Sequence, residues 1–543
     1  MPPPPISRRA LLGAGLPLLA AAGLGGCATR GGSAAAEEGG PVLHLALPHD
    51  PENWDPHQPP FTVSRAVARQ IAETLVDQDP RTGEIRPWLA TEWEADADSR
   101  NFTFRLRDGV TFSDGQPLTA RSVRANFDRI VELGPMAYVG ANLLAGYEGT
   151  TVLDERTVRV SFSESNAQFL QGATTQTLSL LADATLQRTP DEVARGEVIG
   201  SGVYLLEDYR PGEKLVLRRR PDHPWGSGAV DHRGPAAFER VDLSFIPDPT
   251  TLVGALVSGQ VDAAYPLDVA TLGAIPEDRI TLDSRTGSGI SVPLVPLLHR
   301  TLMKEAAVRR ALNHATDRQA IADRIFQGRV RPATSVLTRA TPGWVDMTEY
   351  LRHDPARARQ ILEEAGWQEG PDGIRRRDGE RLQIEIRYSG SGSTYEQMYQ
   401  LLQHQWRQVG IDFRLAPTTP AQMSEYSIYD APYDLSSWSQ GRNDPDVLRV
   451  VYSSFYENQS FFFGRPVREI DDALLAMQRT VHTGKRAEAA ARAQRLILRD
   501  GYSIPLFDSV GTIGWGREVA TIPFDAELKP SFAGARPAGQ EKP

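Results

Sequence analysis

The sequence predicts an α/β protein built from several lobes, and three observations support this. The chain has 543 residues, whereas a single domain usually holds about 100–200. Hydrophobic residues make up 40% of the chain and charged residues 24%, which is typical of a globular protein with a sizeable core. Segments with the periodicity of strands are intermixed with segments that have the periodicity of helices, which favours α/β lobes.

In the first half of the chain, three segments are predicted as strands and one as a helix. Residues 42–47 alternate into an apolar strand, and residues 64–76 carry apolar side chains at helical spacing. Residues 102–112 predict two strands joined by a turn at Asp108 and Gly109. Residues 157–162 alternate again and predict a further strand.

In the second half, helices dominate the predicted elements. Residues 305–314 place apolar side chains on one helical face. Residues 355–364 form a second predicted helix, with proline in its first turn and Gly366 after its end. Residues 382–388 predict a strand, and residues 395–409 predict the helix that follows it.

The chain is acidic, with a net charge of −10. This charge argues against a nucleic-acid partner and against binding to membranes through a basic surface. The alternative is that the charge serves solubility alone. The single cysteine, Cys27, excludes disulfides within the chain and zinc sites made of several thiolates.

Residues 1–26 have the pattern of an export signal. Arg8 and Arg9 precede an uncharged run of small and apolar residues, 10–26, which is too short and too rich in glycine for a good membrane-spanning helix. The segment around the two arginines resembles a twin-arginine signal. Cleavage after Gly26 would change the net charge from −10 to −12.

Cys27 follows Leu24, Gly25 and Gly26, and this segment resembles the lipobox of bacterial lipoproteins. The cysteine is therefore the predicted lipidation site, unless it is a chance cysteine in a glycine-rich stretch. Residues 27–41 are rich in glycine, alanine and serine and predict a flexible tether. The body of the protein is then expected outside the cytoplasm, anchored to the outer face of the cell membrane.

The body of the chain contains a series of short blocks that occur together, in the same order, in one protein family. The blocks are 53–57, 86–94, 101–123, 199–204, 258–262, 308–317, 365–367, 410–411, 433–435, 444–445 and 504–506. Over nearly all of residues 42–515, they resemble the oligopeptide-, dipeptide- and nickel-binding family of ABC-importer solute-binding proteins (family 5).

The resemblance implies an α/β, two-lobed periplasmic-binding-protein-like fold with hinge strands and an extra inserted domain. By analogy, lobe I takes residues 42–80, 196–290 and 508–543, the inserted domain takes 81–195, and lobe II takes 291–507. The implied function is extracytoplasmic capture of a small ligand and delivery to the permease and ATPase of an ABC importer. A monomer is expected, without a cofactor and without enzymatic activity.

The most informative candidate site is the loop from Trp438 to Pro445. In dipeptide-binding relatives, an aspartate three residues after the matching tryptophan captures the ligand's α-ammonium. Here that position is Gly441, and Arg442 stands beside it. Because arginine prefers carboxylate or phosphate groups, Trp438, Arg442 and Asp444 predict a ligand with exposed carboxylates, such as a metal chelate or an opine-like compound. The alternative is that Arg442 pairs internally with Asp444 or Asp446.

Four further residues are candidates for ligand contact. Asn53 and Trp54 follow the first strand, where α/β lobes often place ligand loops, although Trp54 could instead be buried near the hinge. Tyr265 lies just beyond the block at 258–262, and Tyr388 ends a strand before a Ser-Gly repeat. That repeat could approach a ligand or be a surface turn.

Two other functions were weighed against transport. His44, His49 and His57 lie close in sequence and could bind a metal, but no carboxylate–histidine pattern at helical spacing accompanies them. The nucleophile-elbow, zinc-protease, P-loop and dinucleotide-binding motifs are absent from the sequence. A secreted hydrolase and a receptor lipoprotein without transport function remain the alternatives. The sequence leaves the ligand open among peptides, metal chelates, opines and oligosaccharides.

Overall fold

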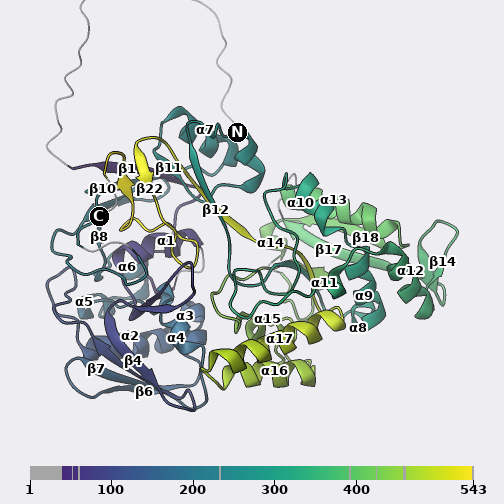
Figure 1. Cartoon of the computed structure of the whole chain (residues 1–543), viewed down its shortest axis with the longest axis horizontal. Coiled ribbons are helices and arrows are strands. Elements are labelled where there is room, and N and C mark those ends of the chain that lie inside the picture. The colour runs from purple at the N-terminus through teal and green to yellow at the C-terminus, as the bar shows by residue number, and fades with distance from the viewer. Residues whose placement is uncertain are drawn as a thin grey trace, which may run out of the picture. The chain divides into compact units, whose positions relative to one another are not determined.

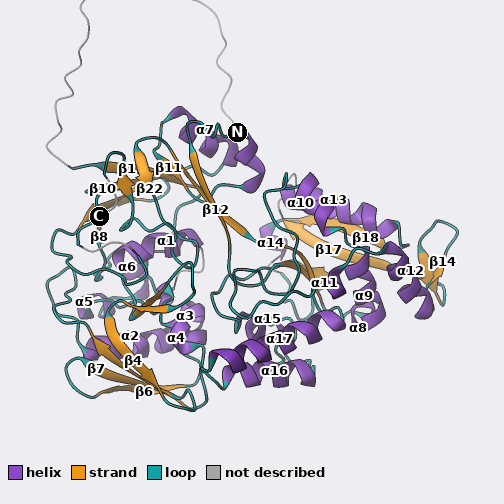
Figure 2. Ribbon diagram, viewed as in Figure 1, coloured by secondary structure: helices purple, strands orange, loops and turns teal. Residues whose placement is uncertain are grey.

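A seven-stranded mixed sheet and a five-stranded mixed sheet organise the chain, and a separate four-stranded antiparallel sheet is inserted in sequence between the first strand of the seven-stranded sheet, β1, and the next, β8 (Figures 1 and 2). The computed structural model describes residues 40–51, 53–58, 62–230, 234–389, 393–423, 425–455 and 460–540. The predicted signal segment, Cys27 and most of the tether lie outside the described residues. No helix in the described part of the chain is long and apolar enough to cross a membrane.

The seven-stranded sheet has the order β12-β21-β11-β1-β10-β9-β8. In that order, its strands are Thr281–Thr286, Val510–Trp515, Ala263–Ala264, Val42–Leu47, Arg240–Phe245, Lys214–Arg219 and Tyr204–Arg210. The central strand β1 pairs in parallel with β10 and β11. The prediction of a strand at 42–47 is thus confirmed.

Strand β1 is covered on both faces because its side chains alternate between two hydrophobic clusters. Leu43, Leu45 and Leu47 pack with residues of α1 (Thr62–Ile71). Ala46 packs with residues of α7 (Pro249–Ser258). This two-sided burial fixes the strand in the middle of the sheet.

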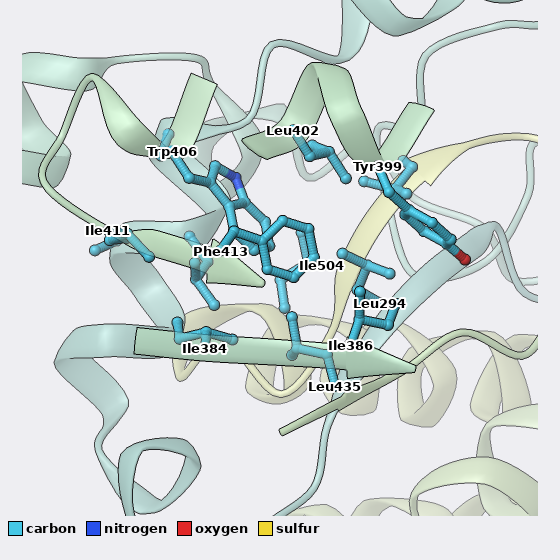
Figure 3. Packing of buried hydrophobic residues seen from close by; sticks show 14 of the residues in the cluster. Leu294, Ile384, Ile386, Tyr399, Leu402, Trp406, Ile411, Phe413, Leu435 and Ile504 are labelled. Atoms are coloured by element: carbon cyan, nitrogen blue, oxygen red, sulfur yellow. The ribbon is translucent and has the colours of Figure 1, made fainter. Parts of the chain in front are cut away.

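The five-stranded sheet has the order β18-β17-β19-β13-β20. In that order, its strands are Asp412–Thr418, Gln383–Ser389, Leu435–Ser436, Val292–Pro296 and Ile504–Phe507. Helix α13 (Thr394–Arg407) packs Leu402 and Trp406 onto Ile384 and Phe413 of this sheet, and all four are fully or almost fully buried (Figure 3). The predicted strand at 382–388 and helix at 395–409 are confirmed to within two residues.

The four-stranded sheet has the order β4-β5-β7-β6, with strands Ala90–Ala95, Asn101–Leu106, Thr157–Phe162 and Tyr147–Val152. Helix α2 (Ala120–Leu133) contributes Val123, Phe127 and Ile130 to the same core. The predicted strand at 157–162 is confirmed as β7. Each of the three large sheets draws its strands from one of the predicted domains, but the exact domain limits stay a prediction.

Two of the predicted secondary-structure elements differ from those in the structure. The second strand expected within 102–112 is wrong: residues after Leu106 form a small loop in which the Leu118 N–H bonds to the Val110 carbonyl. Strand β5 already pairs with β4 and β7, so both of its edges are taken. The helix expected over 64–76 ends at Ile71, whose carbonyl accepts the Gly202 N–H at 2.8 Å.

Two further helices match their predictions. Helix α12 (Pro355–Glu364) begins after Asp354, whose carboxylate accepts the Arg357 N–H at 2.9 Å. It has the predicted bounds. Helix α9 (Ala306–Ala315) lies one residue beyond the predicted range.

The chain crosses from one large sheet to the other at two adjacent segments. Residues 287–291 lead from β12 to β13, and residues 508–509 lead from β20 to β21. The Gly287 N–H donates to the Ser509 carbonyl at 2.8 Å, and the Ser291 hydroxyl donates to the Asp508 carboxylate at 3.0 Å. These paired crossings are the hinge strands of the predicted two-lobed fold.

Candidate ligand-binding site

A cavity of about 880 Å³ opens between the four-stranded sheet region and the loop that follows β19. Five aromatic side chains line it: Tyr138, Tyr426, Tyr433, Trp438 and Phe461. Its other lining residues are Gly134, Pro135, Ala141, Asn142, Met423, Ile428, Ser436 and Ser437. No charged side chain is among these described lining residues. We call this space the aromatic cavity.

Tyr138 reaches the cavity because helix α2 stops abruptly. Gly134 adopts a positive φ of 51° after the last residue of α2, and Pro135 has no backbone N–H to continue the helix. A short turn, η1 (Gly134–Ala137), follows. Tyr138 then starts α3 (Tyr138–Leu143) and forms one wall of the cavity.

Trp438 reaches the cavity because the chain leaves the five-stranded sheet just before it. Strand β19 lies between β17 and β13 and runs parallel to β17. Loops at the carboxyl ends of parallel strands are the usual ligand-binding segments of α/β lobes. The Trp438 ring packs against Phe461 with centroids 6.0 Å apart.

The aromatic walls are incompletely covered. Tyr138 is 38% exposed, Trp438 is 36% exposed and Tyr426 is 40% exposed. Arg387 stands over the rings of Tyr426 and Tyr433, with its guanidinium carbon 5.5 and 5.9 Å from their centroids. A bound apolar body would remove this surface from water, at about 25 cal/mol per Å².

A second, polar cavity of about 210 Å³ adjoins the first and shares Tyr138 and Trp438 with it. Its charged lining residues are Arg65, Arg442 and Glu527, from α1, the loop after β19 and the C-terminal segment. We call it the polar cavity. The two spaces together place charged groups beside an aromatic cavity, a composition usual for a small-ligand site.

Arg442 lines the polar cavity but is already engaged with the protein. It is 8% exposed, and its guanidinium donates to Gln168 at 2.9 Å and to Asp446 at 3.5 Å. Arg449 also binds Asp446, at 2.8 and 2.9 Å. Burial acts to raise the pKa of Asp446, but the two guanidinium groups lower it, and the net shift is downward. Arg442 therefore pairs internally with Asp446, as the alternative expected, and it also lines the polar cavity.

Asp444 lies elsewhere. Its two carboxylate oxygens accept hydrogen bonds from Arg486 at 2.6 and 2.7 Å, and it is 4% exposed. It lines a different cavity of about 220 Å³, beside Arg486 and Pro445. Asp444 therefore fixes the end of the loop and is not brought together with Trp438 and Arg442.

The other four predicted ligand residues line neither the aromatic nor the polar cavity. Trp54 is buried, with its ring centroid 5.0 Å from that of Tyr209, and Tyr265 is buried and donates its hydroxyl to the Leu528 carbonyl at 2.8 Å. Tyr388 donates to Glu396 at 2.8 Å. The Asn53 side chain accepts the Asp55 N–H at 2.9 Å. Each of these groups is occupied in packing or in local hydrogen bonds.

The three N-terminal histidines do not meet. His44 is half exposed and lies 3.8 Å from Asp242, whereas His49 contacts the Asp50 carbonyl at 3.2 Å. His57 is buried against the Ser179 carbonyl and Arg129, and burial lowers its pKa to about 4. No cluster of three or more His, Cys, Asp or Glu residues that could hold a metal occurs in the described residues.

Sequence reasoning missed Tyr138, Tyr426, Tyr433 and Arg65. Tyr433 stands in the block 433–435, but that block carries no ligand signal of its own, and the other three lie outside all the blocks. Tyr138 follows a Gly-Pro pair that predicts only a helix end, and Arg65 is one of 59 lysine and arginine residues. Their role depends on contacts between segments far apart in the chain.

The loop from Trp438 to Pro445, which we call the ligand loop, is hydrogen-bonded to one of the hinge strands. The Ile290 N–H donates to the Gln440 carbonyl at 3.1 Å, and the Arg442 N–H donates to the Ser288 carbonyl at 3.2 Å. Between them, Gly289 has a φ of +125°. A Cβ at Gly289 would lie 2.1 Å from the Gln440 carbonyl oxygen. The close approach of loop and hinge therefore requires glycine at this position.

A model of the bacterial extracellular solute-binding proteins, family 5 (Middle), matches residues 84–462. The chain belongs to this family. Family 5 proteins bind small ligands outside the cytoplasm and work with the permease and ATPase subunits of ABC importers. The resemblance seen in the sequence blocks is thus confirmed.

Individual relatives are distant in sequence but cover nearly the whole chain. The chain is 25% identical over 527 residues to the nickel-binding periplasmic protein of Escherichia coli K12, covering 90% of this chain and 96% of that protein. It is 24% identical over 479 residues to heme-binding protein A of Haemophilus influenzae, covering 83% and 84%. The crystal structure of NikA from Brucella suis in complex with Fe(III)-EDTA has a TM-score of 0.80, with 24% identity, and covers 92% of this chain and 100% of that one. These likenesses confirm the two-lobed fold.

Replacing Gly289 by alanine should displace the ligand loop. The added Cβ meets the Gln440 carbonyl, and the positive φ is strained for any L side chain, at about 1–3 kcal/mol. We expect Gly289→Ala to lower the unfolding temperature and to weaken binding of the native ligand. Gly441→Ala is the matched control, because a Cβ there lies 3.5 Å from the Ser288 carbonyl, an ordinary contact. Equal unfolding temperatures and affinities for the two variants, by thermal unfolding and calorimetry, would contradict the role of this contact.

Proposed function

We propose that this chain captures a small organic ligand between Tyr138 and Trp438 and delivers it to the permease and ATPase of an ABC importer. The observation that carries the proposal is the aromatic cavity of about 880 Å³, whose walls come from α3 on one side and from the loop after β19 on the other. A ligand in it contacts elements on both sides of the hinge strands. Hinge closure around a ligand follows from such an arrangement.

The ligand class that fits best is a carboxylate-bearing compound, such as a metal chelate or an opine-like molecule. Gly441 offers no acid to a peptide's α-ammonium, while Arg65 and Arg442 line the polar cavity. Two relatives point the same way: the NikA structure holds Fe(III)-EDTA, and another relative is named for heme. The metal would be cargo held by its chelator.

The role is one of binding and not of catalysis. Its relatives are the binding proteins of transporters. The buried acids that follow Arg442 in the loop serve in pairs: Asp444 with Arg486, and Asp446 with Arg449. A monomer suffices, because both walls of the cavity come from one chain. The acidic net charge of −10 speaks against nucleic acid as a partner.

The N-terminal segment is proposed to export and anchor the protein. The twin-arginine pattern at Arg8 and Arg9 and the lipobox-like segment ending in Cys27 support a lipoprotein on the outer face of the cell membrane. Residues 27–41 then serve as the tether. Several acyl chains hold a protein firmly at a membrane, whereas a single chain does so only marginally.

Trp438 and Arg442 are the variants that test the binding site. Trp438→Ala removes one aromatic wall and is expected to weaken binding of the native ligand about tenfold or more, with Trp438→Phe recovering most of the affinity. Arg442→Ala is expected to weaken binding about 10–100-fold, and Arg442→Lys should recover only part because it lacks the planar fork.

Calorimetry with the ligand that co-purifies, identified by mass spectrometry, measures these effects. Tyr395→Ala is the matched control for loss of an exposed ring, because Tyr395 is 42% exposed and lines neither cavity. Unchanged affinity of Trp438→Ala would place the ligand elsewhere. Gly441→Asp should not strengthen binding of the native ligand.

Lipid anchoring is tested by Cys27→Ala. The substitution removes the only thiol in the chain that a diacylglycerol group could modify. We expect the variant to appear in the soluble extracytoplasmic fraction, while the unaltered protein stays with the membranes. Fractionation and immunoblotting check this, and a variant that still sediments with membranes would disprove the anchor at residue 27.

A further inference from the structure

Arg65 is a cation with unused hydrogen-bonding capacity beside the polar cavity. It projects from α1, and its side chain is 19% exposed. The nearest carboxylate oxygen, on Glu527, is 3.8 Å away, beyond the range of a hydrogen bond. Among the described residues, its Nε is buried and has no hydrogen-bond partner.

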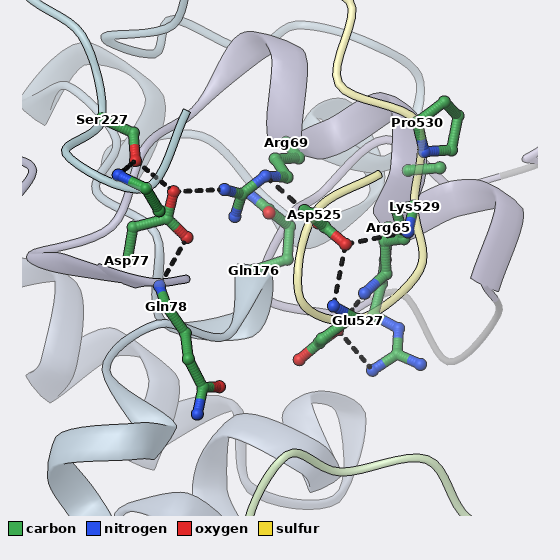
Figure 4. Close-up of polar contacts among 12 residues, drawn as sticks. Arg65, Arg69, Asp77, Gln78, Gln176, Ser227, Asp525, Glu527, Lys529 and Pro530 are labelled. Carbon is green, nitrogen blue, oxygen red and sulfur yellow. Dashed lines mark hydrogen bonds and ion pairs between the residues drawn. The ribbon is translucent and has the colours of Figure 1, made fainter. Parts of the chain in front are cut away.

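The acids next to Arg65 also bind other groups, and Glu527 forms only a long ion pair with Arg65 (Figure 4). Lys529 contacts the Glu527 carboxylate through its ammonium. Asp525 lies 3.2 Å from Arg69 Nε and accepts the backbone N–H groups of Glu527 and Lys529 at 2.8 Å each. Among the described residues, the only carboxylate that pairs with Arg65 is thus that of Glu527, at 3.8 Å, and Lys529 shares it. Arg442, in contrast, donates to both Gln168 and Asp446.

The linings of the two cavities together determine the chemistry of the ligand that can fill them. The aromatic cavity offers flat apolar walls, and none of its described lining residues is charged. The polar cavity adjoins it at Tyr138 and Trp438, which line both, and Arg65 lines the polar cavity with a donor that has no hydrogen-bond partner among the described residues. The ligand that matches both linings has an apolar, planar body with a negative group at one end.

We propose that Arg65 binds the anionic group of a small ligand whose planar apolar body lies between Tyr138 and Trp438. This inference rests on the proposed function and narrows its ligand class to aromatic or otherwise planar organic anions. Arginine presents a planar fork of donors to a carboxylate or sulfonate. Burial lowers the pKa of Arg65, but a guanidinium stays protonated at neutral pH. A ligand with an ammonium group in place of the anionic group would be repelled by the positive charge of Arg65.

Three probes with one body and different charges test this proposal on the full chain by calorimetry: naphthoate, naphthamide and naphthylmethylammonium. We expect naphthoate to bind about tenfold or more tightly than naphthamide, since one charge-assisted hydrogen bond is worth at least a tenfold change. The ammonium probe should bind most weakly. Trp438→Ala should weaken the carboxylate and the amide alike.

Arg65→Gln should reduce naphthoate binding to the level of naphthamide and leave naphthamide binding unchanged, which also reports that the variant is folded. Arg65→Lys should recover part of the preference. Arg218→Gln is the matched control: Arg218 is half exposed, pairs with Glu207, and lines neither cavity. It should leave all three affinities unchanged.

Equal binding of naphthoate and naphthamide, a preference that survives Arg65→Gln, or no binding of either probe would overturn the inference. Each of these outcomes leaves the proposed function intact if Trp438→Ala still weakens binding of the co-purified ligand. If Trp438→Ala has no effect on that ligand, the aromatic cavity itself is not the binding site, and the proposed function of this cavity fails first.

Discussion

The paired crossings at residues 287–291 and 508–509 are the constraint on which the rest of the structure depends. They join the seven-stranded and five-stranded sheets, and they are hydrogen-bonded to each other through Gly287 and Ser509. The ligand loop is bonded to the first crossing at Ser288 and Ile290. Any rotation about the crossings therefore moves the loop that carries Trp438.

This coupling links the aromatic cavity to the hinge strands. A cleft with exposed rings on both sides is unfavourable in water, and a ligand that covers them contributes free energy only when both walls approach it. Arg442 adds a direct link, because its guanidinium bonds to Gln168 from the region of the four-stranded sheet. Ligand binding and closure are thus parts of one equilibrium, in which the ligand favours the state where both walls touch it.

The sequence was a good guide to elements and a weaker guide to the site. Strands 42–47 and 157–162 and helix 355–364 were predicted with their observed bounds, because periodicity and capping residues are local signals. The strand expected after Gly109 failed because β5 already has partners on both edges. The helix expected to Val76 failed because Gly202 takes the Ile71 carbonyl. Both failures come from tertiary contacts that no short window of sequence contains.

The residues of the site likewise fall into those that the sequence predicted and those that only the fold reveals. The loop at Trp438 and Arg442 was predicted from the sequence; Trp438 lines both cavities, and Arg442 lines the polar cavity. Trp54 and Tyr265 resemble ligand residues in sequence but are needed in the core. Tyr138 and Arg65 carry no local signal, and only the fold brings them to Trp438.

Small-angle X-ray scattering with and without the co-purified ligand tests the central claim most directly. If the ligand lies between walls on both sides of the hinge strands, the radius of gyration should fall when the ligand is added, and Trp438→Ala should need more ligand to reach the same value. A scattering profile that does not change at saturating ligand, with binding verified by calorimetry, would contradict the account.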